Sequence, residues 1–123
     1  MHELAIASSL VESAELAARQ AGAGRVTQVF LRLGALSGVS KEALLFSYDV
    51  ATHGTLLEGS RLIIEDVPLA IYCESCRVEV RLPGIQSLRC PRCGRLSPHI
   101  RQGKELEIVG IEIEVEDAMK EAI

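Results

Sequence analysis

Four cysteines form two Cys-x-x-Cys pairs, Cys73 with Cys76 and Cys90 with Cys93, and thirteen residues separate the two pairs. The chain contains no other cysteine. Two such pairs can bring four thiolates to the corners of a tetrahedron, which is the coordination that zinc prefers in proteins. Because four sulfur ligands leave no open coordination position, the pattern predicts a structural zinc site rather than a catalytic one.

The two pairs differ in the residues around them. In the second pair, Pro91 restricts the turn and Gly94 permits the left-handed conformation in which backbone N–H groups face the sulfurs, so this segment is typical of a zinc knuckle. Residues 73–76 lack both features. Two alternatives remain open, a redox dithiol and a rubredoxin-type iron site. The aromatic content of 3% offers little shielding for iron, so we favour zinc.

The cysteine segment is also basic. Residues 71–104 carry seven basic and two acidic residues, a net charge of +5, whereas the rest of the chain carries −9 of the total of −4. Arginines beside a zinc ribbon could contact phosphates in a nucleic acid. We favour this alternative less than a solvated face or a protein-docking element, because Tyr72 is the one nearby aromatic residue for base stacking.

A second possible metal site lies at the N-terminus, in the sequence Met1-His2-Glu3. The α-amine of Met1, the backbone amide nitrogen of His2 and the His2 imidazole could form two fused chelate rings, and Glu3 could add an oxygen. Three nitrogens in a plane suit Ni(II) or Cu(II). The alternative is that His2 is an ordinary polar surface residue. His99, just beyond the second cysteine pair, could orient the zinc knuckle or add a ligand, but we favour a surface role for it.

The elements that must position these residues can be read from hydrophobic periodicity. Apolar residues at three- and four-residue intervals predict a helix over residues 3–20, and alternation predicts a strand over 25–33. Ser40 is a suitable N-cap for a second helix over residues 41–52. We expect further strands over residues 62–67, 69–72 and 105–116.

This order of elements predicts an α+β fold, in which two helices pack on a small, mostly antiparallel three-stranded sheet. The cysteine segment then forms an inserted zinc-ribbon-like module. We place the body at residues 1–68 and 105–123 and the zinc-binding module at residues 69–104. The strands on either side of the module are expected to pair with each other in one sheet.

Size and composition limit the class of protein. The 123 residues correspond to about one domain, and 48% hydrophobic residues suffice for an aliphatic core. The sequence shows neither an apolar run long enough to cross a bilayer nor a cleavable signal pattern, so we expect a cytoplasmic protein without membrane attachment. In that reducing compartment, paired cysteines bind metals more often than they form disulfides.

The whole chain resembles the hydrogenase nickel-incorporation family called HypA/HybF. The resemblance rests on residues 1–7 (Met-His-Glu-Leu-Ala-Ile-Ala) at the start of a helix and on the two cysteine pairs. It also rests on Gly54-Thr55, Glu58-Gly59 and residues 103–106, which lead into the alternating pattern of residues 111–115.

This resemblance implies a metallochaperone without catalytic turnover that delivers Ni(II) to maturing [NiFe] hydrogenase. Nickel would bind at His2, assisted by the Met1 amine and Glu3, and the four cysteines would hold a structural Zn(II). The implied partners are the GTPase HypB and the hydrogenase large subunit, and some members also serve urease. Some relatives place a histidine directly after a cysteine pair, where this chain has Arg77 and Gly94.

Overall fold

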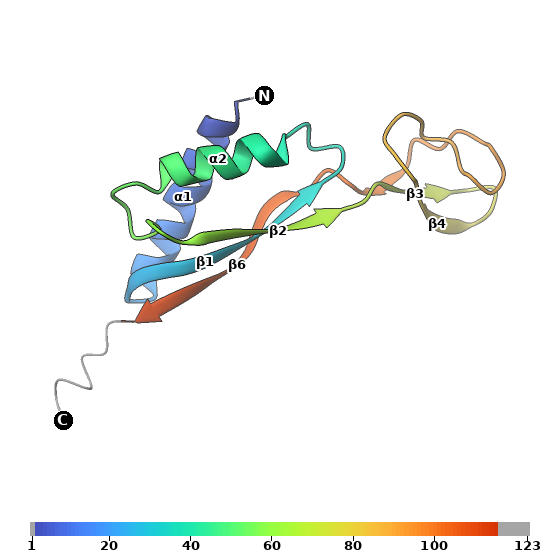
Figure 1. The fold of residues 1–123 in the computed structure, drawn as a ribbon. Helices are drawn as coiled ribbons and strands as arrows, with labels where there is room; N and C mark the ends of the chain where they lie inside the picture. Colours follow the sequence, from blue (N-terminus) through green and yellow to red (C-terminus); the bar gives the residue numbers. More distant parts are fainter. Residues whose placement is uncertain (1, 116–123) are drawn as a thin grey trace. The chain divides into compact units, whose positions relative to one another are not determined.

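The computed structural model of the chain describes residues 2–115 (Figure 1). The chain forms two compact units. Of the described residues, 2–31, 39–63 and 108–115 belong to the first unit, and 32–38 and 64–107 belong to the second. The second unit includes both cysteine pairs and a short segment, residues 32–38, that lies far from them in the sequence. The predicted body and zinc-binding module divide the chain in a similar way but with different bounds. The assignment of nickel to the body and of zinc to the module remains a prediction.

Two helices belong to the first unit, α1 (Glu3–Gln20) and α2 (Lys41–Ala51). Both confirm the predictions from periodicity. The buried face of α1 consists of small and β-branched residues at three- and four-residue spacing, namely Ala7, Val11, Ala14 and Ala18. At the start of α2, the Ser40 side chain accepts a hydrogen bond from the Ala43 N–H at 3.3 Å, as expected for an N-cap.

A three-stranded sheet contains β1 (Ala23–Gly34), β2 (Arg61–Val67) and β6 (Leu106–Val115), in the order β2-β1-β6. Both helices lie over one face of this sheet in Figure 1. Strand β6 runs opposite to β1, whereas β2 points the same way as β1. The strands on either side of the cysteine segment share one sheet, but the prediction that they pair with each other is wrong, because β1 lies between them.

A second sheet, antiparallel throughout, has the order β4-β3-β5 and belongs to the second unit. Its strands are β3 (Ala70–Cys73), β4 (Val78–Arg81) and β5 (Ile100–Gln102). The periodicity predicted β3 but missed β4 and β5, which are only four and three residues long. Strand β3 leads directly into the first cysteine pair, so the pairing of β3 with β4 closes a hairpin around it.

The second unit has a small core that includes two of the cysteines. Leu69, Ile71, Leu82, Cys73 and Cys90 are buried and pack together. Their packing fixes one sulfur from each cysteine pair in the interior of the unit.

The described residues therefore form an α+β fold of two helices with a mixed three-stranded sheet, a small antiparallel sheet and a four-cysteine cluster. The fold class is the one that the sequence predicted. None of the described helices is long and apolar enough to cross a membrane.

Candidate metal sites

All four cysteine sulfurs come together in the second unit. The Sγ atoms of Cys73, Cys76, Cys90 and Cys93 lie within 4.8 Å of one another. The closest approaches join the two pairs rather than the partners within a pair, since Cys73 Sγ lies 3.5 Å from Cys93 Sγ and Cys76 Sγ lies 4.0 Å from Cys90 Sγ. The arrangement is that of a four-cornered cluster, not of two separate dithiols.

These distances match the size of a zinc–thiolate tetrahedron. With Zn–S bonds of about 2.3 Å, the sulfurs of a regular tetrahedron are about 3.8 Å apart. The measured 3.5 Å and 4.0 Å bracket this value. The donor set and its geometry therefore fit a closed Zn(II) site, in which all four sulfurs would hold the ion.

Each of the two loops that present the sulfurs has a residue with positive φ directly after its second cysteine. In the second loop, Gly94 has φ +75° and its N–H donates to the Cys90 carbonyl at 2.7 Å, as the glycine predicted. In the first loop, the equivalent residue is Arg77, which has φ +53° without being glycine. The Cys76 N–H lies 3.4 Å from Cys73 Sγ, the N–H···S interaction of a metal-binding knuckle. Residue type alone gave no signal for the left-handed Arg77.

The sulfur neighbours of Cys76 disfavour its ionisation. Hydrogen bonding with the Cys93 sulfur raises the pKa of Cys76 to about 12, and desolvation and the other two cysteines act in the same direction. A metal bound at the cluster would displace the Cys76 proton, and its charge would stabilise the Cys76 thiolate.

A polar pocket of about 330 Å³ lies beside the cluster and is lined by residues 73–75 and 95–99. Within it, His99 Nε2 lies 2.9 Å from the Glu74 carboxylate, and both side chains are at least half exposed. The Ser97 hydroxyl donates to the Tyr72 carbonyl and ties the second loop to β3. His99 is thus paired with a residue of the first cysteine loop, a contact that the sequence analysis did not identify.

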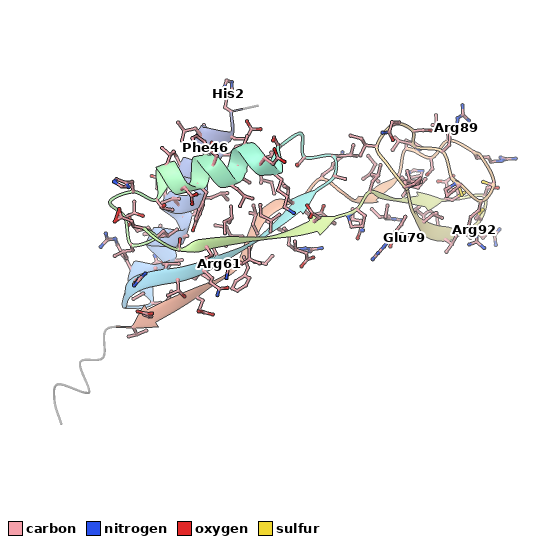
Figure 2. All side chains as sticks on the ribbon, in the orientation of Figure 1. His2, Phe46, Arg61, Glu79, Arg89 and Arg92 are labelled. Atoms are coloured by element: carbon pink, nitrogen blue, oxygen red, sulfur yellow. The ribbon has the colours of Figure 1, made fainter. Side chains whose placement is uncertain are left out.

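The N-terminal segment lies in the first unit. His2 is the N-cap residue of α1, and its carbonyl accepts a hydrogen bond from the Ile6 N–H at 3.1 Å. Its imidazole is exposed and has no hydrogen-bond or ion-pair partner among residues 2–115. Figure 2 shows this side chain pointing away from both helices. Met1, the third predicted ligand residue, lies outside the described residues.

Glu3 connects the N-terminal segment to α2. Its Oε2 accepts a hydrogen bond at 3.1 Å from the backbone N–H of Ser40, the N-cap of α2. This hydrogen bond lowers the pKa of Glu3 below its ordinary value, so the carboxylate remains ionised. The two residues are 37 positions apart, and the sequence pattern gave no indication of this contact.

Two arginines of the second unit make contacts within it. Arg101 lies over one face of the Tyr72 ring, 4.9 Å from its centroid. Arg89 donates to the Gly94 carbonyl at 3.1 Å and stabilises the second cysteine loop. Figure 2 shows Arg89 and Arg92 in this unit.

Comparison with known proteins gives consistent matches over nearly the whole chain. A family model described as "Hydrogenase/urease nickel incorporation, metallochaperone, hypA" matches residues 1–113. A protein of Roseiflexus sp. (strain RS-1), "Hydrogenase maturation factor HypA", is 57% identical over 114 residues, which cover 93% of each chain. A protein of Chloroflexus aggregans with the same name is 47% identical and covers 91% of this chain and 98% of its own.

The fold is also found among solved structures. The solution structure of the Ni metallochaperone HypA from Helicobacter pylori superimposes with a TM-score of 0.66 and covers 94% of this chain and all of its own. Another HypA solution structure gives a TM-score of 0.69. Both are 23% identical to this chain and support the fold alone.

Proposed function

The chain belongs to the HypA family of hydrogenase and urease nickel-incorporation metallochaperones, and we propose that it binds Ni(II) and delivers it during the maturation of [NiFe] hydrogenase. The match of the family model over residues 1–113, which includes both candidate metal sites, is the observation that carries this proposal. In this role the protein transfers an ion without catalytic turnover.

His2 is proposed as the principal nickel ligand. The imidazole is exposed and makes no capping hydrogen bond within the described part of the chain, so it is accessible to an ion and to a partner protein. Its backbone amide precedes the helix and is not required as an intrahelical donor, so it can lose its proton when metal binds. With the Met1 amine, these groups would supply three nitrogens in a plane, which suits Ni(II).

Glu3 is proposed to assist, in a position set by α2. One carboxylate oxygen accepts the hydrogen bond from Ser40, which leaves the second oxygen for the metal. The same carboxylate thereby holds the N-terminal segment near the start of α2. Because these ligands lie on the exposed first residues of the chain, a receiving protein can approach them. A nickel carrier requires this access in order to release its ion.

The four cysteines, Cys73, Cys76, Cys90 and Cys93, are proposed to hold a structural Zn(II). Four sulfurs close the coordination sphere, and two of them belong to the core of the second unit. The zinc would supply cross-links between the two loops, and the protein would supply the N–H···S interactions and the packing around Cys73 and Cys90.

The proposed partners are the GTPase HypB and the large subunit of the hydrogenase, with urease maturation proteins as further candidates, and the proposed location is the cytoplasm. The proposed partners and location are inferred from membership of a family whose description names nickel incorporation into hydrogenase and urease. The alternative of a nucleic-acid-binding zinc ribbon is not favoured, because the matched relatives are named as hydrogenase maturation factors.

The test of nickel binding compares His2→Ala with His53→Ala in zinc-loaded protein. Both histidines are exposed and belong to the first unit, and the His53 Nδ1 lies 3.4 Å from the exposed Glu58 carboxylate. Calorimetric titration with Ni(II) should show that His2→Ala lowers the nickel affinity by at least about 100-fold. Replacing a residue that contacts a metal ligand, but not the metal itself, typically lowers the affinity by about 10- to 100-fold. His53→Ala should bind like the wild type, and zinc content should be unchanged in both. Wild-type nickel affinity in His2→Ala would refute the assignment.

A further inference from the structure

Strand β6 lies at the edge of its sheet. In the order β2-β1-β6 it has one neighbour, so the N–H and C=O groups along its other side have no strand partner among the described residues. Natural proteins usually protect such an edge with charged side chains, lysine above all, or with proline, because unpaired backbone groups can bind another strand. Residues 108–115 contain neither lysine nor proline, and their charged residues are Glu112 and Glu114. Val109 and Val115 are more than half exposed on this strand.

Helix α1 forms an apolar groove along the same strand. A groove of about 370 Å³ is lined by Ser13, Ala14 and Ala17 of α1 and by residues 108–111 of β6. Its walls are small because the helix presents alanine and serine here and the strand presents Gly110, which has no side chain. All of these residues belong to the first unit. The groove has the size and polarity to accept an apolar side chain from a strand added to β6.

The charged side chains of β6 determine which kind of strand could bind along this edge. Glu112 and Glu114 are both exposed on β6. Glu112 is partly engaged, since its carboxylate accepts a hydrogen bond from the Thr27 hydroxyl at 2.9 Å. Glutamates on two adjacent strands would repel each other, so a second copy of β6 is a poor occupant. A strand in which lysine or arginine alternates with apolar residues would place cations near the glutamates and apolar residues near the groove.

From these observations we infer that residues 108–115 of β6 form a docking edge for an extended segment of a partner protein in which apolar and basic residues alternate. The backbone of the segment would continue the sheet, one apolar side chain would enter the groove beneath α1, and its cations would pair with the β6 glutamates. Nickel binding is not required for this interaction, so the inference stands apart from the proposed function.

The test uses full-length, zinc-loaded protein and a capped synthetic peptide, Lys-Val-Lys-Ile-Lys-Val-Lys. A control peptide with proline in place of both valines keeps the charge but cannot pair along its length. NMR amide exchange should show new protection within residues 108–115 with the first peptide and none with the second. Protection by both peptides, or by neither, would overturn the inference. It would also fail if the outward amides of β6 were already protected in the free protein, or if sedimentation showed a dimer formed through β6.

Variants distinguish docking at the groove from simple charge attraction. Ala17→Leu fills the groove and should weaken peptide binding by about tenfold, because it excludes one apolar side chain. Ala5→Leu is the matched control on another exposed position of α1 and should have no effect. Glu114→Lys should weaken binding and reduce its dependence on salt. Equal affinity of the Ala17→Leu and Ala5→Leu proteins would show that the groove is not used and would contradict the inference.

Discussion

The hydrogen bond between Tyr48 and Ser60 anchors α2 and gives a quantitative test of the packing of the first unit. The two hydroxyl oxygens are 2.6 Å apart, and the residues are only 1% and 9% exposed. Tyr48→Phe removes the bond and leaves the Ser60 hydroxyl without its partner. A lost hydrogen bond and one unsatisfied buried group together cost about 2 kcal/mol in the free energy of unfolding.

A double-mutant cycle isolates this contribution. Ser60→Ala leaves the tyrosine hydroxyl unpaired and should cost a similar amount, whereas the double variant leaves neither group unsatisfied. The sum of the stability losses in the two single variants should therefore exceed the stability loss in the double variant by about 1–2 kcal/mol. Urea unfolding followed by far-ultraviolet circular dichroism at 222 nm reports on the first unit, because both described helices belong to it. Additive losses would refute the assigned coupling.

The same pair predicts a pH dependence with a definite sign. Burial raises the pKa of Tyr48 above its ordinary value, opposed in part by the hydrogen bond with Ser60. A raised pKa in the folded state contributes stability below the ordinary value of about 10, and this stability is lost as the pH rises through the folded value. The difference in stability between wild type and Tyr48→Phe should therefore narrow above about pH 10. A difference that stayed constant or widened there would contradict this account of Tyr48.

Two further predictions concern the cysteine unit. Arg77→Gly should leave the free energy of unfolding unchanged or raise it by up to about 1 kcal/mol, because it relieves a left-handed arginine but adds freedom to the unfolded chain. Gly94→Ala should lower the free energy of unfolding by about 1–2 kcal/mol, because it places a side chain at a positive φ. A stabilising Gly94→Ala would argue against the left-handed conformation at this position. Removal of zinc with a chelator should abolish amide-exchange protection in β3, β4 and β5 but retain the helical signal of the first unit, since two cysteines belong to the small core of the second unit. Retained protection in the chelated protein would show that the metal is not structural.

The sequence was sufficient to predict features that depend on local periodicity or fixed spacing. Both helices were predicted because their apolar residues recur at helical intervals and Ser40 marks the second start. The four cysteines were predicted to converge because two Cys-x-x-Cys loops can fold around one ion, and their sulfurs do lie within 4.8 Å of one another. Strands β4 and β5 were missed because three or four residues show too little alternation to separate them from a loop.

Contacts between distant residues could not be predicted in this way. The Glu3 carboxylate reaches the Ser40 N–H only because α1 and α2 pack together, and nothing in either local sequence encodes that pairing. The position of β1 between β2 and β6 is likewise set by packing rather than by the pattern within any one strand. The edge and groove of β6 follow from that strand order and so could be found only in the structure.

The most direct test of nickel binding at the N-terminus is to add Gly-Pro before Met1 and measure Ni(II) affinity by calorimetric titration. The addition converts the Met1 amine into an amide, and because proline has no N–H, the new N-terminus cannot build a replacement chelate of backbone nitrogens that reaches His2. The His2 imidazole, Glu3 and all four cysteines stay in place. A protein with Gly-Pro added after Ile123 is the matched control. We predict that the N-terminal addition lowers the nickel affinity by at least about 100-fold, a larger loss than is typical when a residue that does not contact the metal is changed. The zinc content should be unchanged, and the control should bind nickel like the wild type. Equal nickel affinity in the two extended proteins would contradict the proposed site.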